Sequence, residues 1–268
     1  MDSDQDKIFR LIKDLYKGED FISLHRPIFD NEEKNILEET IESNFVSSVG
    51  KKVDEFEKIL ATFTGARFAV VTMNGTAALH VSLHANGIDR NSEVITQAMT
   101  FVATANSIKY TGADVSFIDV DPKTLGMSAD SLKDYLSKFS ENKNGKIVNK
   151  ITGKEIKACI PMHTFGFPCN AKEILEICKE NNIIMIEDCA ESLGSFIGAK
   201  HTGTFGQCGT LSFNGNKIIT TGGGGAVFTD SEELAKKIKH LTTTAKKSHP
   251  YEYFHDELGF NYRLPNIN

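Results

Sequence analysis

The sequence predicts an α/β protein of three layers, in which helices cover both faces of a mainly parallel sheet. Along residues 67–188, short apolar segments rich in β-branched residues alternate with segments of helical periodicity. This order is typical of right-handed βαβ crossovers. The composition agrees, because 268 residues with 40% hydrophobic and 25% charged content suit a soluble protein with a large core.

The first 25 residues lie outside this alternation and predict an arm or a peripheral helix. Their apolar side chains recur on one helix face, at Ile8, Leu11, Ile12 and Leu15. We therefore divide the chain into an N-terminal arm over residues 1–25 and one large domain over residues 26–268.

The elements of the large domain follow in order. Strands are expected at residues 67–73, 93–97, 114–121, 156–163 and 182–188, and helices at 75–87, 103–112 and 171–181. Gly87 and Gly112 end the first two helices. The polar stretch 138–155 predicts a surface excursion that need not be a domain boundary.

Composition also excludes several classes of protein. A net charge of -6 and an isoelectric point near 5.8 argue against nucleic-acid binding, which needs a basic surface. No segment approaches the roughly 18 apolar residues of a membrane helix. The N-terminus is acidic where a signal peptide would be basic, so we expect a cytoplasmic protein with no membrane contact.

The five cysteines indicate reduced, packed thiols. Their number is odd and no CxxC pair occurs, so we expect neither a disulfide framework nor a metal site.

Ligands of open α/β sheets bind outside the carboxyl ends of the strands, so the candidate site is expected there. Asn74, Gly75 and Thr76 follow the first strand and open a helix, whose N-terminus could hold a phosphate. Asn74 acting only as a helix cap is an equal alternative. Phe101 follows the next strand and could stack on a flat ring, although core packing is the common role of phenylalanine.

Two further strand ends carry charged residues. Glu187 and Asp188 end an apolar strand, where a buried carboxylate needs a partner such as a pyridinium nitrogen; a structural ion pair is the alternative. Ser212 ends another strand, and Lys217 follows five residues later. A lysine in such a place can form a Schiff base, although most lysines are solvated surface charges.

The glycine run Gly222–Gly225 does not fit a P-loop, whose glycines precede the lysine. Because apolar segments flank the run, it predicts a tight passage between ordered strands rather than a linker. Taken together, a phosphate site, an aromatic face, a carboxylate and a lysine predict pyridoxal phosphate as the cofactor.

The order of these motifs resembles the nucleotide-sugar aminotransferases of the DegT/StrS type, which have the aspartate-aminotransferase fold (fold type I). The resemblance covers Pro27 to Asn268. It rests on six segments in order, namely NGTAAL, TFVATANSI, PMHTFG, EDCAES, SFNGNK and NYRLPNIN.

The resemblance implies a role for each candidate residue. Lys217 would form the Schiff base with the cofactor and Asp188 would contact the pyridine nitrogen. Phe101 and Ala190 would cover the two ring faces. The phosphate would be held by Gly75, Thr76 and Ser212, and by Asn261 of the partner subunit in a homodimer with shared active sites.

Two features depart from the family pattern. Glu191 stands where many members have Gln or His near the ring oxygen of the cofactor, which leaves its role open. The chain ends at Asn268, where members continue into a small C-terminal domain, so that domain is expected to be absent.

The resemblance also implies a reaction. The segments FNGNKIITTGGGG and HDELGFNYRLPNIN are most similar to the branch that acts on UDP-linked 4-keto-6-deoxy-N-acetylhexosamines. The reaction would transfer an amino group, from glutamate, to the sugar ketone. Alternatives are a pyridoxal phosphate-binding fragment without turnover, a non-catalytic regulator, and a sugar dehydratase, against which Lys217 argues because dehydratases replace this lysine with histidine.

Overall fold

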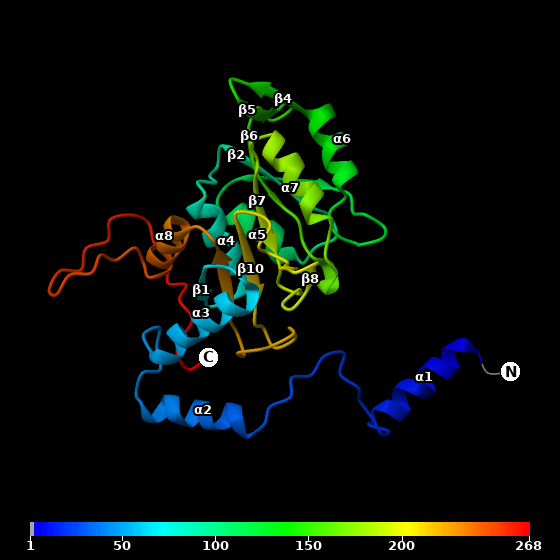
Figure 1. Ribbon diagram of the computed structural model, residues 1–268, viewed down its shortest axis with the longest axis vertical. Helices are drawn as coiled ribbons and strands as arrows, with labels where there is room; N and C mark the ends of the chain where they lie inside the picture. Colours follow the sequence, from blue (N-terminus) through cyan, green and yellow to red (C-terminus); the bar gives the residue numbers. More distant parts are fainter. Residues whose placement is uncertain (1–2) are drawn as a thin grey trace.

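The computed structural model describes residues 3–268 and is built around one mixed sheet (Figure 1). The strand order is β1-β11-β10-β7-β6-β2-β3, and the pair β4 and β5 joins at β6. The strands of this sheet are β1 (Phe68–Thr72), β2 (Ser92–Gln97), β3 (Asp114–Ile118), β4 (Ser140–Lys143), β5 (Lys146–Asn149), β6 (Glu155–Ile160), β7 (Ile184–Asp188), β10 (Cys208–Ser212) and β11 (Gly225–Thr229). A separate hairpin pairs β8 (Phe196–Ile197) with β9 (Lys200–His201).

The centre of the sheet is parallel. Strands β10, β7, β6, β2 and β3 run in the same direction, whereas β11 is antiparallel to both of its neighbours, β1 and β10. The predicted α/β class with a mainly parallel, mixed sheet is confirmed. The carboxyl ends of the parallel strands therefore meet at one edge.

Helices cover both faces of the sheet and complete the three layers. They are α1 (Asp4–Leu15), α2 (Asn31–Glu42), α3 (Lys51–Thr64), α4 (Gly75–Ala85), α5 (Val102–Tyr110), α6 (Ala129–Phe139), α7 (Ala171–Glu180) and α8 (Glu232–Thr242), with a 3-10 turn at Thr164–Gly166. Neighbouring strand residues point into opposite cores, as period-2 alternation requires. Val70 packs with α4, α5 and α8, whereas Val71 packs with α3. Ile95 packs with α6 and α7.

The N-terminal helix α1 stands apart from the sheet in Figure 1. It buries none of its residues. Met1 and Asp2 lie outside the described residues, and the division of the chain at residue 25 stays a prediction.

The stretch 138–155 is mostly exposed, in agreement with the predicted surface excursion, but it contains regular strands. Strands β4 and β5 form a hairpin there, and Val148 of β5 pairs with Glu155 of β6. Ile147 and Val148 are buried, and Ile147 packs in the core with α6 and α7. The buried Asn149 also attaches the hairpin, because its side chain donates a 2.8 Å hydrogen bond to Glu93.

The expected packing of the cysteines is confirmed. Their thiols are free and buried at Cys159, Cys169, Cys178, Cys189 and Cys208. Within residues 3–268, no helix has the length and apolar character needed to cross a membrane.

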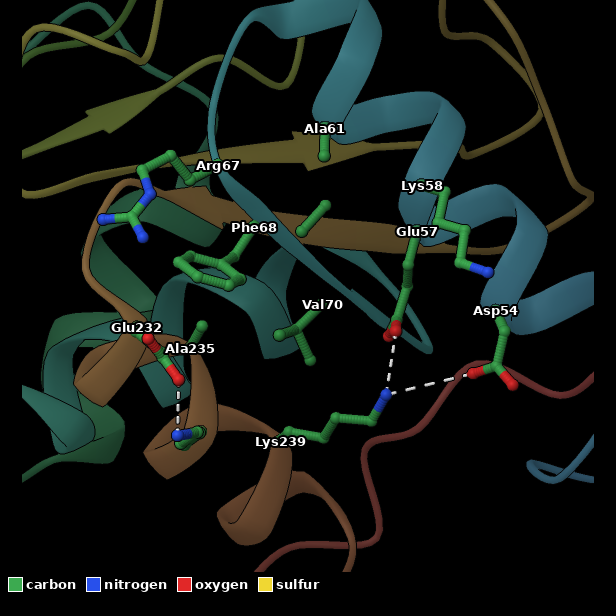
Figure 2. Close-up of a pocket in the computed structure, with 12 residues that line it drawn as sticks. Asp54, Glu57, Lys58, Ala61, Arg67, Phe68, Val70, Glu232, Ala235 and Lys239 are labelled. Carbon is green, nitrogen blue, oxygen red and sulfur yellow. Dashed lines mark hydrogen bonds and ion pairs between the residues drawn. The ribbon is translucent and has the colours of Figure 1, made fainter.

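A buried carboxylate fastens the C-terminal segment to the sheet. Glu57 of α3 accepts hydrogen bonds from the Val71 amide at 3.1 Å and from Nη1 of Arg263 at 2.8 Å. Its second oxygen lies 2.9 Å from Nζ of Lys239 on α8, on one side of a cavity of about 480 Å³ (Figure 2). Arg263 also pairs with Thr72, so this network fixes the end of β1, from which the candidate site begins.

Candidate active site

The turn from β1 into α4 forms a cradle with the end of β10. Asn74 caps α4, because its side chain accepts a hydrogen bond of 2.7 Å from the Ala77 amide. In residues 3–268, the amides of Gly75 and Thr76 have no hydrogen-bond acceptor. A Cβ at Gly75 would lie 2.8 Å from Cβ of Ser212, so the glycine allows the two segments to touch. Two amides and a hydroxyl at a helix N-terminus suit a phosphate.

The position of Gly225 requires glycine, because its backbone passes close to that of Asn74. In register, Gly225 lies opposite Thr72 of β1 and opposite Ser212 of β10. A Cβ there would lie 2.5 Å from the carbonyl carbon of Asn74 and would push the backbone away. The predicted tight passage between strands is confirmed at this position, and it keeps the two halves of the cradle together.

Asp188 ends β7 and is buried at the same edge of the sheet. Its Oδ2 accepts a hydrogen bond of 2.7 Å from the Thr104 hydroxyl, and its Oδ1 accepts one of 3.1 Å from the Ala190 amide. Burial raises the pKa of the Asp188 carboxyl above its ordinary value, against the opposing effect of these hydrogen bonds. Such a carboxylate favours a cationic partner.

Glu187 points to the other face and has a structural role. Its carboxylate accepts hydrogen bonds from the backbone amides of Gly203, Phe205 and Gly206, at 2.7 to 2.8 Å. Nε2 of the buried His163 lies 3.1 Å away. Of the two acids at this strand end, only Asp188 belongs to the candidate site.

Lys217 lies in the turn after β10, with a side chain that is 12% exposed. Its Nζ is 3.3 Å from Oε1 of Glu191 and 5.9 Å from the centre of the Phe101 ring. The charge of Lys217 also acts on Asp188. The structure therefore brings together four of the predicted site residues, Lys217, Glu191, Phe101 and Asp188, from three separate strand ends.

The positions of two other predicted residues, Ala190 and Asn261, give less support for a role in the site. Ala190 is half-buried and reaches the site through its amide. Asn261 is exposed and pairs with Thr243, away from the hydrogen bonds of Asp188 and Lys217. Its contact with a partner subunit stays a prediction.

Sequence reasoning missed Thr104, which orients Asp188 from 84 residues away in the chain. One signal was available, because Thr104 follows Phe101 in the first turn of a helix that starts at a strand end.

These residues fit pyridoxal phosphate. The cradle offers donors for a phosphate, Asp188 is a buried acid, and Lys217 is an amine held beside an aromatic ring. The cavity in Figure 2 is elsewhere, between α3, β1 and α8, and neither Asp188 nor Lys217 lines it.

Comparison with known proteins also points to aminotransferases. The chain is 38% identical over 247 residues to the GDP-perosamine synthase of Escherichia coli O157:H7, which covers 92% of this chain and 63% of that protein. An aminotransferase structure from Brucella abortus matches with a TM-score of 0.80 at 30% identity, over 88% of this chain and 61% of that one.

A third match is Helicobacter pylori PseC, an aminotransferase involved in pseudoaminic acid biosynthesis, with a TM-score of 0.78 at 28% identity. That match covers 91% of this chain and 62% of PseC. The chain thus spans less than two thirds of the length of these relatives. Residues 27–268 match the sequence profile of one family. The chain belongs to the DegT/DnrJ/EryC1/StrS aminotransferase family.

Proposed function

We propose that this chain carries the cofactor site of an aminotransferase that converts a keto group of a nucleotide-linked sugar to an amine. Pyridoxal phosphate is the cofactor of the family. The observation that carries the proposal is the convergence of Lys217, Asp188 and the Gly75 cradle at one edge of the sheet.

Bound pyridoxal phosphate supplies an electron-withdrawing ring that stabilises negative charge at the substrate carbon. Gly75, Thr76 and Ser212 would hold its phosphate group. Asp188, held by the Thr104 hydroxyl, would lie at the ring nitrogen and would stabilise a positive charge there. These contacts fix the ring relative to the lysine.

Lys217 has two tasks in this proposal. Its amine anchors the cofactor, and once released it moves a proton at the substrate carbon. Phe101, whose ring lies 5.9 Å from Nζ, would cover one ring face, and Ala190 would cover the other. In a homodimer, Asn261 reaches the phosphate of the partner's site.

The substrate is a 4-keto-6-deoxy sugar carried by a nucleotide, and the amino donor is glutamate. The segments around Lys217 and Asn261 favour a UDP-linked N-acetylhexosamine. The name of the relative GDP-perosamine synthase supports a nucleotide-linked substrate and offers GDP as the competing nucleotide. A cytoplasmic location stays a prediction.

An absorbance titration with pyridoxal phosphate, followed by borohydride reduction and peptide mapping, tests the cofactor site. We expect a visible band and a reduced adduct on Lys217. The band should be lost in Lys217→Ala and kept in Lys200→Ala, a matched control because Lys200 also lies over an aromatic ring, that of Phe205, at 4.8 Å. No band in the wild-type protein, or an adduct on other lysines only, would overturn the cofactor assignment.

Substrate is tested by assaying the protein with glutamate and UDP-, GDP- and dTDP-linked 4-keto-6-deoxy sugars. Formation of 2-oxoglutarate with the UDP sugar supports the proposal. Turnover only with a GDP sugar would replace the UDP assignment, and cofactor binding without turnover on any of them would favour a binding protein.

A further inference from the structure

The Glu191 carboxylate contacts two hydrogen-bond donors. Oε1 lies 3.3 Å from Nζ of Lys217, and Oε2 accepts a hydrogen bond of 2.9 Å from the backbone amide of Phe165. A carboxylate offers two acceptor oxygens, whereas a glutamine amide offers one acceptor and one donor. Glutamine could therefore satisfy only one of these two donors.

We infer that Glu191 is a positioning residue that links the Lys217 amino group to the loop at Phe165, and that the link requires both of its oxygens. Its importance for catalysis rests on the proposed function, because Lys217 is the proposed cofactor lysine. The link itself involves only residues of this chain.

The loop needs such a contact because its backbone is strained. Phe165 has a φ of 54°, in the left-handed region that non-glycine residues rarely adopt. Gly166 follows with a φ of 83°, and its carbonyl accepts a 2.7 Å hydrogen bond from the Ser195 hydroxyl. The contact from Glu191 is thus made to the strained residue itself. Strain of this kind persists only where surrounding contacts hold it.

The loop also forms part of the site's exposed surroundings. The residues Phe165 and Phe167 are 66% and 62% exposed. Because the Phe165 amide is bonded to Glu191, a shift of the carboxylate would move the backbone that carries these rings. A change at Lys217 can therefore reach the surface through one side chain.

Lys217 has few other groups to hold it. The charged groups that act on this region are the carboxylates of Asp188 and Glu191, and the Phe101 ring lies beside Nζ. Only Glu191 makes an ion pair with Lys217 among the described residues. Loss of that pair should leave the amine free to rotate.

Amide hydrogen exchange of the cofactor-free protein tests the link, because exchange reports local opening without any turnover. The segment to follow is residues 163–168. Glu191→Gln should raise its exchange rate roughly tenfold, since the charged acceptor becomes a neutral amide whose single oxygen cannot serve both the Phe165 amide and Lys217. Lys217→Met should raise it by a smaller factor, and the double variant should exchange no faster than Glu191→Gln alone. The control is Lys239→Met, which breaks the separate pair with Glu57 and should leave this segment unchanged.

Unchanged exchange in Lys217→Met, or additive effects in the double variant, would overturn the inference, because the two residues would then act independently. If Glu191→Gln does not fold, Lys217→Met decides the question alone. The result is separate from the cofactor test. If the wild-type protein binds no pyridoxal phosphate but the two substitutions are coupled, the proposed function is wrong and the link is supported. If the protein shows the visible band but the substitutions are not coupled, only the link is wrong.

Discussion

The Thr104 hydroxyl lies 2.7 Å from Oδ2 of Asp188, and both side chains are buried at the carboxyl edge of the sheet. Thr104 is also 2.7 Å from the Thr100 hydroxyl, where either oxygen can be the donor. The carboxylate therefore lies at the end of a short hydroxyl chain. Thr104 donates its one proton to the carboxylate and accepts from Thr100, and this direction can reverse only if a donor replaces the carboxylate. This arrangement holds Asp188 in place whether or not a cation faces it.

We predict that Asp188→Asn raises the melting temperature of the cofactor-free protein at pH 7 by about 2 °C or more. The asparagine oxygen can still accept the hydrogen bond from the Ala190 amide, and its NH₂ group can donate to the Thr104 hydroxyl. No hydrogen bond is therefore lost. Burial raises the pKa of Asp188, so the folded protein binds this proton more tightly than the unfolded chain. The difference between variant and wild type should shrink as pH falls toward the ordinary pKa of an aspartate.

The same substitution should lower aminotransferase turnover roughly a hundredfold or more, because a charge that stabilises the ring nitrogen is removed. Thermal melts across pH and a rate assay on one preparation give both readouts. Unchanged turnover would contradict the proposed role of Asp188. If the wild-type protein were more stable than Asp188→Asn at pH 7, the claim that the buried charge of Asp188 destabilises the folded protein would be wrong.

Much of this site followed from the sequence because parallel strands bring their carboxyl ends to one edge. Gly75, Asp188 and Lys217 could be placed there from short apolar segments and the residues after them. The Thr104 contact could not, since it depends on how α5 packs beside β7. The same holds for Glu187, whose amide partners come from residues 203–206.

Some secondary structure was missed for a different reason. The β4 and β5 hairpin has a polar sequence, and its strands form by pairing with β6 rather than by a local preference. In contrast, α8 has a clear pattern, with Leu234, Ile238 and Leu241 buried at helical spacing. Its periodicity alone indicates a helix, although the elements predicted from the sequence do not include it.

The second prediction concerns the cradle. Gly75→Ala should weaken pyridoxal phosphate binding roughly tenfold or more, because the new methyl group would lie 2.8 Å from Cβ of Ser212 and force the turn away from β10. Gly215→Ala is the matched control, since a methyl group there meets no atom within 4 Å. Titrations of the visible band give both dissociation constants. Equal affinities for the two variants would show that the cradle does not hold the phosphate.

The third prediction concerns the buried pair of Glu57 and Arg263. Glu57→Gln should cost about 3–5 kcal/mol of unfolding free energy, because it leaves the buried guanidinium without a counter-charge. Glu55→Gln removes an exposed pair with Lys51 from the same helix and should cost less than about 1 kcal/mol. Urea denaturation at pH 7 measures both. Similar losses would mean that the network does not fasten the C-terminal segment.

The fourth prediction is a pH dependence that arises at His80. This side chain is 6% exposed, its Nδ1 lies 3.2 Å from the Tyr262 hydroxyl, and burial lowers its pKa to about 4, with a smaller contribution from His84. As pH falls from about 6.5 toward 4, the unfolded chain takes up a proton that the folded protein does not, so stability is lost in this window.

His80→Gln should remove that part of the loss. Between pH 7 and pH 4.5 we expect the unfolding free energy of the wild-type protein to fall by about 1 kcal/mol more than that of the variant. Screening by solvent keeps this difference below the full value that the pKa shift implies. His249→Gln changes an exposed histidine and should follow the wild-type curve. Urea denaturation at several pH values measures the three curves. Parallel curves for wild type and His80→Gln would show that His80 is protonated as readily in the folded protein as in the unfolded chain, which its burial beside Tyr262 argues against.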